Sequence, residues 1–141
     1  MNLPSWIEVD RGKLADRFDR DQLPHALLIH GPAGAGRRLL AASIAGHMVG
    51  FDSGSLDVTA FSGTRIGDEA LPAHPDFRLV QPAEDKRTII IEQIRDLIGF
   101  LTLTSYGHGA RAALVFPAQA MTPSAANGLL KTLEEPAADS Y

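Results

Sequence analysis

The chain has 141 residues, of which 45% are hydrophobic and 21% charged, with a net charge of −4 and no cysteine. These values are typical of a folded soluble domain or a piece of one, without a membrane-spanning run or signal peptide, so we expect a cytoplasmic protein. The lack of cysteine excludes disulfides, thiolate nucleophiles and cysteine-ligated zinc. The acidic balance argues against direct DNA binding, because domains that grip the phosphate backbone present a clustered basic face.

The N-terminal half predicts a helix, a strand and a second helix, in that order. Apolar spacing favours a short amphipathic helix over about residues 11–19. The apolar run at 25–30 stops at Gly31 and predicts a buried strand that enters a loop. Residues 37–50 fit a helix with one buried face. The segment 49–73 is rich in Gly, Ser, Thr and Asp and predicts a loop insertion.

The C-terminal half continues the alternation. Strands are predicted at 77–80 and 112–116, and a helix is predicted to begin near Ile91. A last helix is expected after Thr122, the capping residue, and Pro123 at its first position. Its apolar stripe contains Ala126, Leu129, Leu130 and Leu133. Three strands that alternate with helices predict an α/β fold with a parallel sheet.

Residues 31–38 read Gly-Pro-Ala-Gly-Ala-Gly-Arg-Arg and have the glycine spacing of a P-loop, in which backbone N–H groups surround phosphate oxygens. A working loop continues with lysine and then Ser or Thr, which holds magnesium, but here these positions are Arg37 and Arg38. The candidate phosphate-contacting residues are Gly31, Gly34, Gly36, Arg37 and Arg38. We predict a degenerate loop, although the Arg37 guanidinium leaves room for weak nucleotide or phosphate binding. The alternative is a plain strand-to-helix turn.

The strand at 112–116 tests the same site independently. P-loop ATPases place an aspartate at the end of such a strand to organise magnesium, whereas this chain has Pro117 and Ala118 there. With both metal-handling positions lost, we expect no magnesium, no catalytic residue and no ATP hydrolysis.

Four motifs resemble the bacterial clamp-loader subunits of DNA polymerase III, which are AAA+ proteins. The most specific runs from Asn127 to Pro136 and is similar to the family's Asn-x-Leu-Leu-Lys-Thr-Leu-Glu-Glu-Pro signature. In the family's order before it come His-Ala-Leu-Leu at 25–28, His-Pro-Asp-Phe at 74–77 and Ile-Glu-Gln-Ile-Arg at 91–95. The resemblance covers most of the chain. It implies a P-loop NTPase (AAA+) domain, a three-layer parallel sheet with flanking helices, here truncated before the lid and collar domains.

The departures from the family indicate which type of subunit this is. Gamma and tau subunits keep an intact P-loop and metal aspartate, while delta-prime subunits often lose them, so Arg37, Arg38 and Pro117 favour the delta-prime type. Related subunits bind zinc through four cysteines in the insertion, but residues 49–73 contain none, so no zinc is expected. The family's Ser-Arg-Cys arginine finger does not occur in these 141 residues.

The resemblance implies a non-hydrolysing structural subunit of a DNA-directed DNA polymerase (nucleotidyltransferase) holoenzyme. Its partners would be the gamma or tau and delta subunits and, through the assembled complex, the sliding clamp and primed DNA. Two alternatives stay open. One is an active P-loop ATPase with a relocated metal ligand, such as Asp76 or Glu84. The other is an interaction module that has left DNA replication.

The remaining polar residues give weaker signals. Lys131, Glu134 and Glu135 either face a neighbouring subunit or form a solvated face with an i,i+4 pair between Lys131 and Glu135. Two carboxylates at a helix C-terminus cost a few tenths of a kcal/mol each, which hints at a contact elsewhere. The five histidines are scattered over different elements and predict no metal site.

Overall fold

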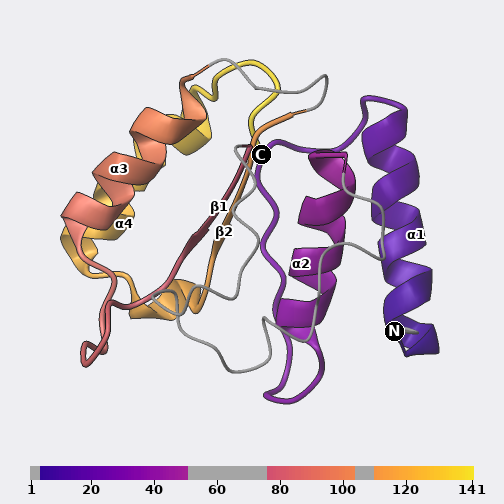
Figure 1. Cartoon of the computed structure of the whole chain (residues 1–141), viewed down its shortest axis with the longest axis horizontal. Coiled ribbons are helices and arrows are strands. Elements are labelled where there is room, and N and C mark those ends of the chain that lie inside the picture. The colour runs from indigo at the N-terminus through magenta and orange to yellow at the C-terminus, as the bar shows by residue number, and fades with distance from the viewer. Residues whose placement is uncertain (1–3, 51–75, 104–109) are drawn as a thin grey trace.

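The computed structural model of the protein describes residues 4–50, 76–103 and 110–141. The elements of these residues are α1 (Ser5–Asp19), α2 (Arg37–Met48), β1 (Phe77–Val80), α3 (Ile91–Leu101), β2 (Ala112–Val115), the short 3-10 helix η2 (Ala118–Ala120) and α4 (Pro123–Glu134). In Figure 1 the two strands lie at the centre, with α3 and α4 on one side and α2 followed by α1 on the other. The predicted mixed α/β class is confirmed.

Strands β1 and β2 are parallel, with Phe77 opposite Ala112 and Val80 opposite Val115. The ladder continues at the carboxyl end, where the Phe116 N–H donates to the Val80 carbonyl at 2.9 Å. On its other edge β2 meets the last residues of the chain, because the Ala113 N–H donates to the Tyr141 carbonyl at 2.8 Å. The sheet of the described residues therefore has two full strands, and residues 139–141 start a further parallel pairing.

The segment 25–30 corrects the sequence analysis. We expected a buried strand, but the structure shows an extended stretch without strand pairing, in which Leu28 is 78% exposed. A strand is stable only when a neighbour takes up its backbone N–H and C=O groups. Both edges of β2 are already occupied around Arg111 to Ala113, one by β1 and the other by residues 139–141. Among the described residues, none forms a strand pairing with this run, which therefore stays extended outside the sheet.

Helix α1 begins earlier than the helix expected at about residues 11–19. The Pro4 carbonyl accepts hydrogen bonds from the N–H groups of Ile7 at 2.9 Å and Glu8 at 3.0 Å, which starts the helix. Ile7 is 1% exposed, so the extra turns bury a large side chain that the prediction had left outside the helix. That burial stabilises the helix by about 1.5–3 kcal/mol.

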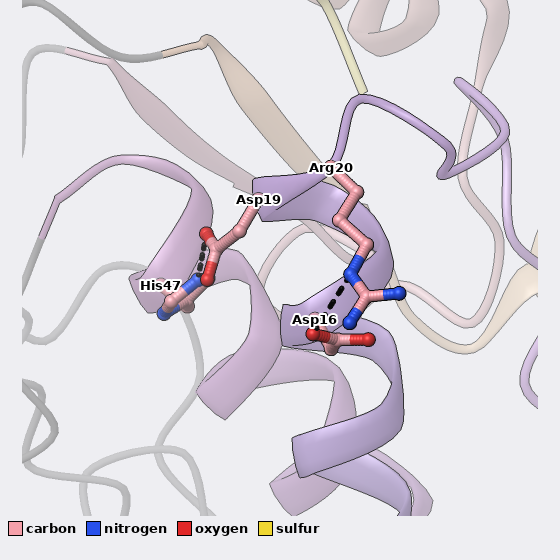
Figure 2. A network of polar contacts seen from close by, with 4 residues as sticks. All are labelled: Asp16, Asp19, Arg20 and His47. Carbon is pink, nitrogen blue, oxygen red and sulfur yellow. Dashed lines mark hydrogen bonds and ion pairs between the residues drawn. The ribbon is translucent and has the colours of Figure 1, made fainter.

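The carboxyl ends of α1 and α2 meet in a polar contact. Figure 2 shows His47 beside Asp19, with 2.8 Å between Nε2 and Oδ1, and the nearby pair of Arg20 and Asp16, 3.3 Å apart. The Phe18 ring lies edge-on to the His47 ring, with 5.8 Å between their centroids. The contact adds an exposed hydrogen bond to the apolar packing of α1 on α2, and α2 in turn packs on the sheet.

Two apolar clusters hold the layers together. One lies between α1, α2 and β2 and contains Ala15, Leu23, Ile44, Ala45, Met48, Val49 and Ala112. The other lies between the strands, α3 and α4 and contains Val80, Ile89, Ile94, Leu97, Phe100, Leu101 and Ala125. Helices predicted at 37–50 and near Ile91 are thus confirmed, and each buries the face that its apolar spacing defines.

Helix α4 begins as predicted, because Thr122 Oγ1 accepts a hydrogen bond from the Ala125 N–H at 3.1 Å. The predicted apolar stripe is wrong in part. Ala125 is fully buried, whereas Leu130 and Leu133 are 51% and 38% exposed. The helix approaches α3 closely at Gly128, where a Cβ atom would lie 2.5 Å from Ile91 Cδ1. This approach buries the start of α4 and leaves the leucines of its last turns in solvent.

The segment predicted as a loop insertion, 49–73, lies outside the described residues except for its first two positions. Among the helices described, none has both the length and the hydropathy that a membrane crossing requires.

Candidate functional site

The glycine loop connects the extended segment 25–30 to α2. The Ala35 N–H donates to the Pro32 carbonyl at 3.2 Å, which closes a tight turn. Gly36 is the N-cap of α2 with a φ of 85°, in the left-handed region that favours glycine. Helix α2 then begins at Arg37, so the loop delivers the chain directly into the amino end of a helix, as a phosphate-binding loop does.

The amino end of α1 packs against this loop. A Cβ atom on Gly36 would lie 2.7 Å from both Trp6 Cη2 and Ile7 Cδ1. Such a distance is shorter than carbon atoms tolerate, so a larger residue at this position would have to displace the Trp6 or Ile7 side chain. Trp6 is 51% exposed, and its ring edge therefore lies against the loop while the rest faces solvent. The helix predicted at about residues 11–19 did not include Trp6, so this contact was not foreseen from the sequence.

Arg37 and Arg38 occupy the first turn of α2, and both are half-buried. The stem of Arg37 lies against the loop, with Cδ 3.9 Å from the position of a Cβ atom on Gly31. No acidic residue accompanies them in this turn. Cations at a helix N-terminus are disfavoured by the helix dipole by a few tenths of a kcal/mol each, so other contacts must hold them there.

Arg38 contacts the end of β2. Its Cζ atom lies 4.2 Å from the centroid of the Phe116 ring, within the range of a cation–π interaction. The contact brings the amino end of α2 to the carboxyl end of β2, where Pro117 follows. Arg38, which follows the glycine loop, therefore lies beside the residue that directly precedes the two positions identified after the strand. Periodicity and motif spacing give no signal for such a contact.

The residues at this junction do not fit a magnesium nucleotide. Mg²⁺ takes oxygen ligands in near-octahedral geometry. Arg38 has only donor nitrogens, Phe116 has no polar side-chain atom, and Pro117 has neither a carboxylate nor a hydroxyl. No step of ATP hydrolysis can therefore be assigned to the side chains at these positions.

The relocated metal ligands that we considered lie elsewhere. Asp76 precedes β1 and is 1% exposed, at the amino ends of the parallel strands, whereas the glycine loop meets their carboxyl end. Its carboxylate faces Arg111, with 3.6 Å between Oδ1 and Nη2. Glu84 is exposed in the turn that follows β1.

The histidines within the described residues have other contacts. His25 forms a hydrogen bond with the Leu133 carbonyl at the end of α4, and His47 forms one with Asp19. His30 is exposed, and His74 and His108 lie outside the described residues. Over the described ranges, no group of three or more His, Asp or Glu side chains gathers as metal ligands would.

The charged end of α4 is open to solvent. Lys131, Glu134 and Glu135 are all exposed. Among the ion pairs of the described residues, none joins Lys131 to Glu135. The exposed leucines Leu130 and Leu133 lie on the same turns. This end of the helix therefore combines apolar and charged side chains on one accessible surface.

Comparison with known proteins shows that the chain is similar to subunits of DNA polymerase III. The sequence model of the family described as "DNA polymerase III, delta subunit" matches residues 11–141. The DNA polymerase III subunit delta' of Pseudomonas aeruginosa is 38% identical over 123 residues, which are 86% of this chain and 37% of that protein.

Two other bacteria have similar proteins. The DNA polymerase III subunit delta' of Escherichia coli K12 is 28% identical over 137 residues, 96% of this chain and 40% of that protein. The one from Bacillus subtilis is 31% identical over 142 aligned positions, 96% of this chain and 42% of that protein. The chain thus spans about two fifths of the length of these relatives.

Proposed function

The chain belongs to the family described as DNA polymerase III, delta subunit, and from this premise we propose that it is part of a clamp-loader subunit of the delta-prime type that does not hydrolyse ATP. The role is structural: the domain helps to hold the ring of subunits that loads the sliding clamp at primed DNA during replication. The place of action is the cytoplasm.

One observation supports the proposal that the chain does not hydrolyse ATP. Arg38, at the position of the P-loop hydroxyl, contacts Phe116, which directly precedes Pro117 and Ala118, where a strand-end carboxylate would stand. Neither side chain offers an oxygen, and Pro117 offers none either. Two ligands from two elements are replaced at one junction, so a single restored residue would not rebuild the metal site.

The fold that we propose for the whole domain is the AAA+ P-loop fold with three layers. Helices on both sides of parallel strands, and a glycine loop that enters α2 near the carboxyl end of β2, support it. Ligands of open α/β sheets bind at this edge. We assign the loop residues Gly31, Gly34, Gly36, Arg37 and Arg38 to a phosphate cradle that has lost its function.

The partners that we propose are the gamma or tau and delta subunits. The exposed end of α4, with Lys131, Glu134 and Glu135, is the candidate contact surface because its charges have no ion-pair partner on their own helix. A central apolar contact with a polar rim is the usual composition of a protein interface.

Assembly tests this function. The full chain is mixed with purified gamma or tau and delta subunits and passed over a size-exclusion column, and ATP turnover is measured for each component alone. We expect co-elution with the other subunits and no turnover by this protein alone. Turnover that is lost on Arg37→Ala would establish the active ATPase instead. Failure to co-elute with any of these subunits would favour the interaction module outside replication.

A further inference from the structure

The contact between Arg38 and Phe116 joins two elements that are each held firmly by other interactions. Phe116 is fixed by its backbone N–H, which donates to the Val80 carbonyl at 2.9 Å. Helix α2 is fixed by its buried face, in which Ala42 is 0% and Ile44 3% exposed. A side-chain contact between two such elements sets the distance from the glycine loop to the strand end.

The loop is held from a second side by α1. Gly36 lies directly against Trp6 and Ile7, and the stem of Arg37 covers Gly31. The turn is therefore contacted by α1, by the stem of Arg37 and, through Arg38, by the end of β2. In a working P-loop protein the phosphates and the metal ion supply much of this bracing.

We propose that the cation–π contact of Arg38 with Phe116 replaces the magnesium bridge as the link between the glycine loop and the end of β2, so that the loop keeps its closed shape without a nucleotide. This inference rests on the proposed function, since it assigns to the lost nucleotide site a structural contact between the glycine loop and β2. The guanidinium charge and the aromatic ring are both required. Arg37, which stands where a working P-loop has its lysine, is not required for this link.

The test is a double-mutant cycle in the full chain with Arg38→Met, Phe116→Leu and the double variant. Methionine keeps a long stem without charge, and leucine keeps an apolar side chain without a ring. Arg37→Met is the matched control, because it removes the same charge from the neighbouring position. Folding equilibrium constants come from urea denaturation, and backbone hydrogen exchange of residues 33–38 is followed by mass spectrometry.

We expect each single variant to lower the folding constant by about two- to fivefold, the usual worth of such a contact. The double variant should lose no more of the stability that this contact contributes than either single variant does. Amide exchange at residues 33–38 should be faster in all three variants but not in Arg37→Met. Phe116→Tyr, which keeps a ring, should behave as wild type. If a variant is too unstable for denaturation curves, exchange in the folded population gives the answer.

Additive losses of stability in the double variant would contradict the proposed contact. Equal amide exchange rates at residues 33–38 in Arg38→Met and Arg37→Met would also contradict it. Neither result would affect the proposed function. ATP hydrolysis by the wild-type chain would overturn the proposed function even if the coupling were present. The two failures are therefore distinct.

Discussion

Asp76 and Arg111 form a buried ion pair at the amino ends of the parallel strands, with side chains 2% and 7% exposed. Arg111 Nη1 also donates to the Phe100 carbonyl at 3.3 Å, and its guanidinium lies 4.7 Å from the Phe100 ring centroid. The pair thus ties β1, β2 and α3 together at the end of the sheet opposite to the glycine loop. Its place there gives it a structural role.

Replacing Asp76 by alanine should reduce the free energy of unfolding by about 3–5 kcal/mol, because the charge of Arg111 would stay buried without its carboxylate partner. Urea denaturation measures the loss. The matched control is Asp10→Ala, which removes an exposed carboxylate 3.9 Å from Lys13 and should cost no more than about 1 kcal/mol. Similar losses in the two variants would contradict the importance of the buried pair.

Gly36→Ala and Gly34→Ala separate backbone strain from the contact with α1. Both glycines have a positive φ, 85° and 81°, so both variants pay about 1–2 kcal/mol for the left-handed conformation. Only at Gly36 does the added methyl group meet Trp6 and Ile7, while Gly34 faces open space. Gly36→Ala should therefore lose a further 1–3 kcal/mol, roughly the cost of overpacking.

Tryptophan fluorescence reports the same difference, because Trp6 is the only tryptophan of the sequence. Its emission should shift in Gly36→Ala and stay unchanged in Gly34→Ala. Equal spectra and equal stabilities in the two variants would show that α1 does not brace the loop.

The raised pKa of Tyr141 predicts that the folded protein loses stability at alkaline pH. Burial raises the pKa of its phenol above the usual 10.0, and the carboxylates of Asp21 and Asp139 raise it further. A raised pKa in the folded state means that the protonated phenol is favoured by folding. The contribution is fully present below about pH 10 and is lost as pH rises from there through the folded pKa.

The measurement is the free energy of unfolding as a function of pH for the wild type and Tyr141→Phe. The wild-type curve should fall more steeply above about pH 10, since phenylalanine cannot ionise. Parallel curves would show that the Tyr141 phenol titrates alike in the folded and unfolded chain.

Charge reversal at the end of α4 should weaken subunit assembly without destabilising the domain. The variant Lys131→Glu, Glu134→Lys, Glu135→Lys changes only exposed side chains, so its free energy of unfolding should match that of the wild type within about 0.5 kcal/mol. Co-elution with gamma or tau and delta subunits should be lost. Asp10→Lys with Lys13→Glu is the control on α1 and should assemble normally.

Local signals predicted most of the elements. The capping Thr122 with Pro123, and the apolar spacing after Ile91, marked helices at their observed starts because capping and amphipathicity are encoded within one or two turns. The strands at 77–80 and 112–116 were found from short apolar runs that end at prolines.

The errors come from packing that the local sequence does not contain. The run at 25–30 has strand composition, but a strand also needs a neighbour that takes up its backbone groups, and none of the described residues pairs with it. Leu130 and Leu133 fit the helical stripe, yet the close approach at Gly128 buries only the beginning of α4. For the site, the glycine spacing identified the loop, while the contacts of Arg38 with Phe116 and of Trp6 with Gly36 depend on the tertiary fold.

The most direct test of the account is calorimetric titration of the full chain with ATP in the presence and absence of magnesium. We expect no magnesium-dependent binding, because the junction of the glycine loop with β2 offers Arg38, Phe116 and Pro117, whose side chains supply none of the oxygen ligands that the metal requires. Magnesium-dependent binding of ATP that disappears on Arg37→Ala would contradict it.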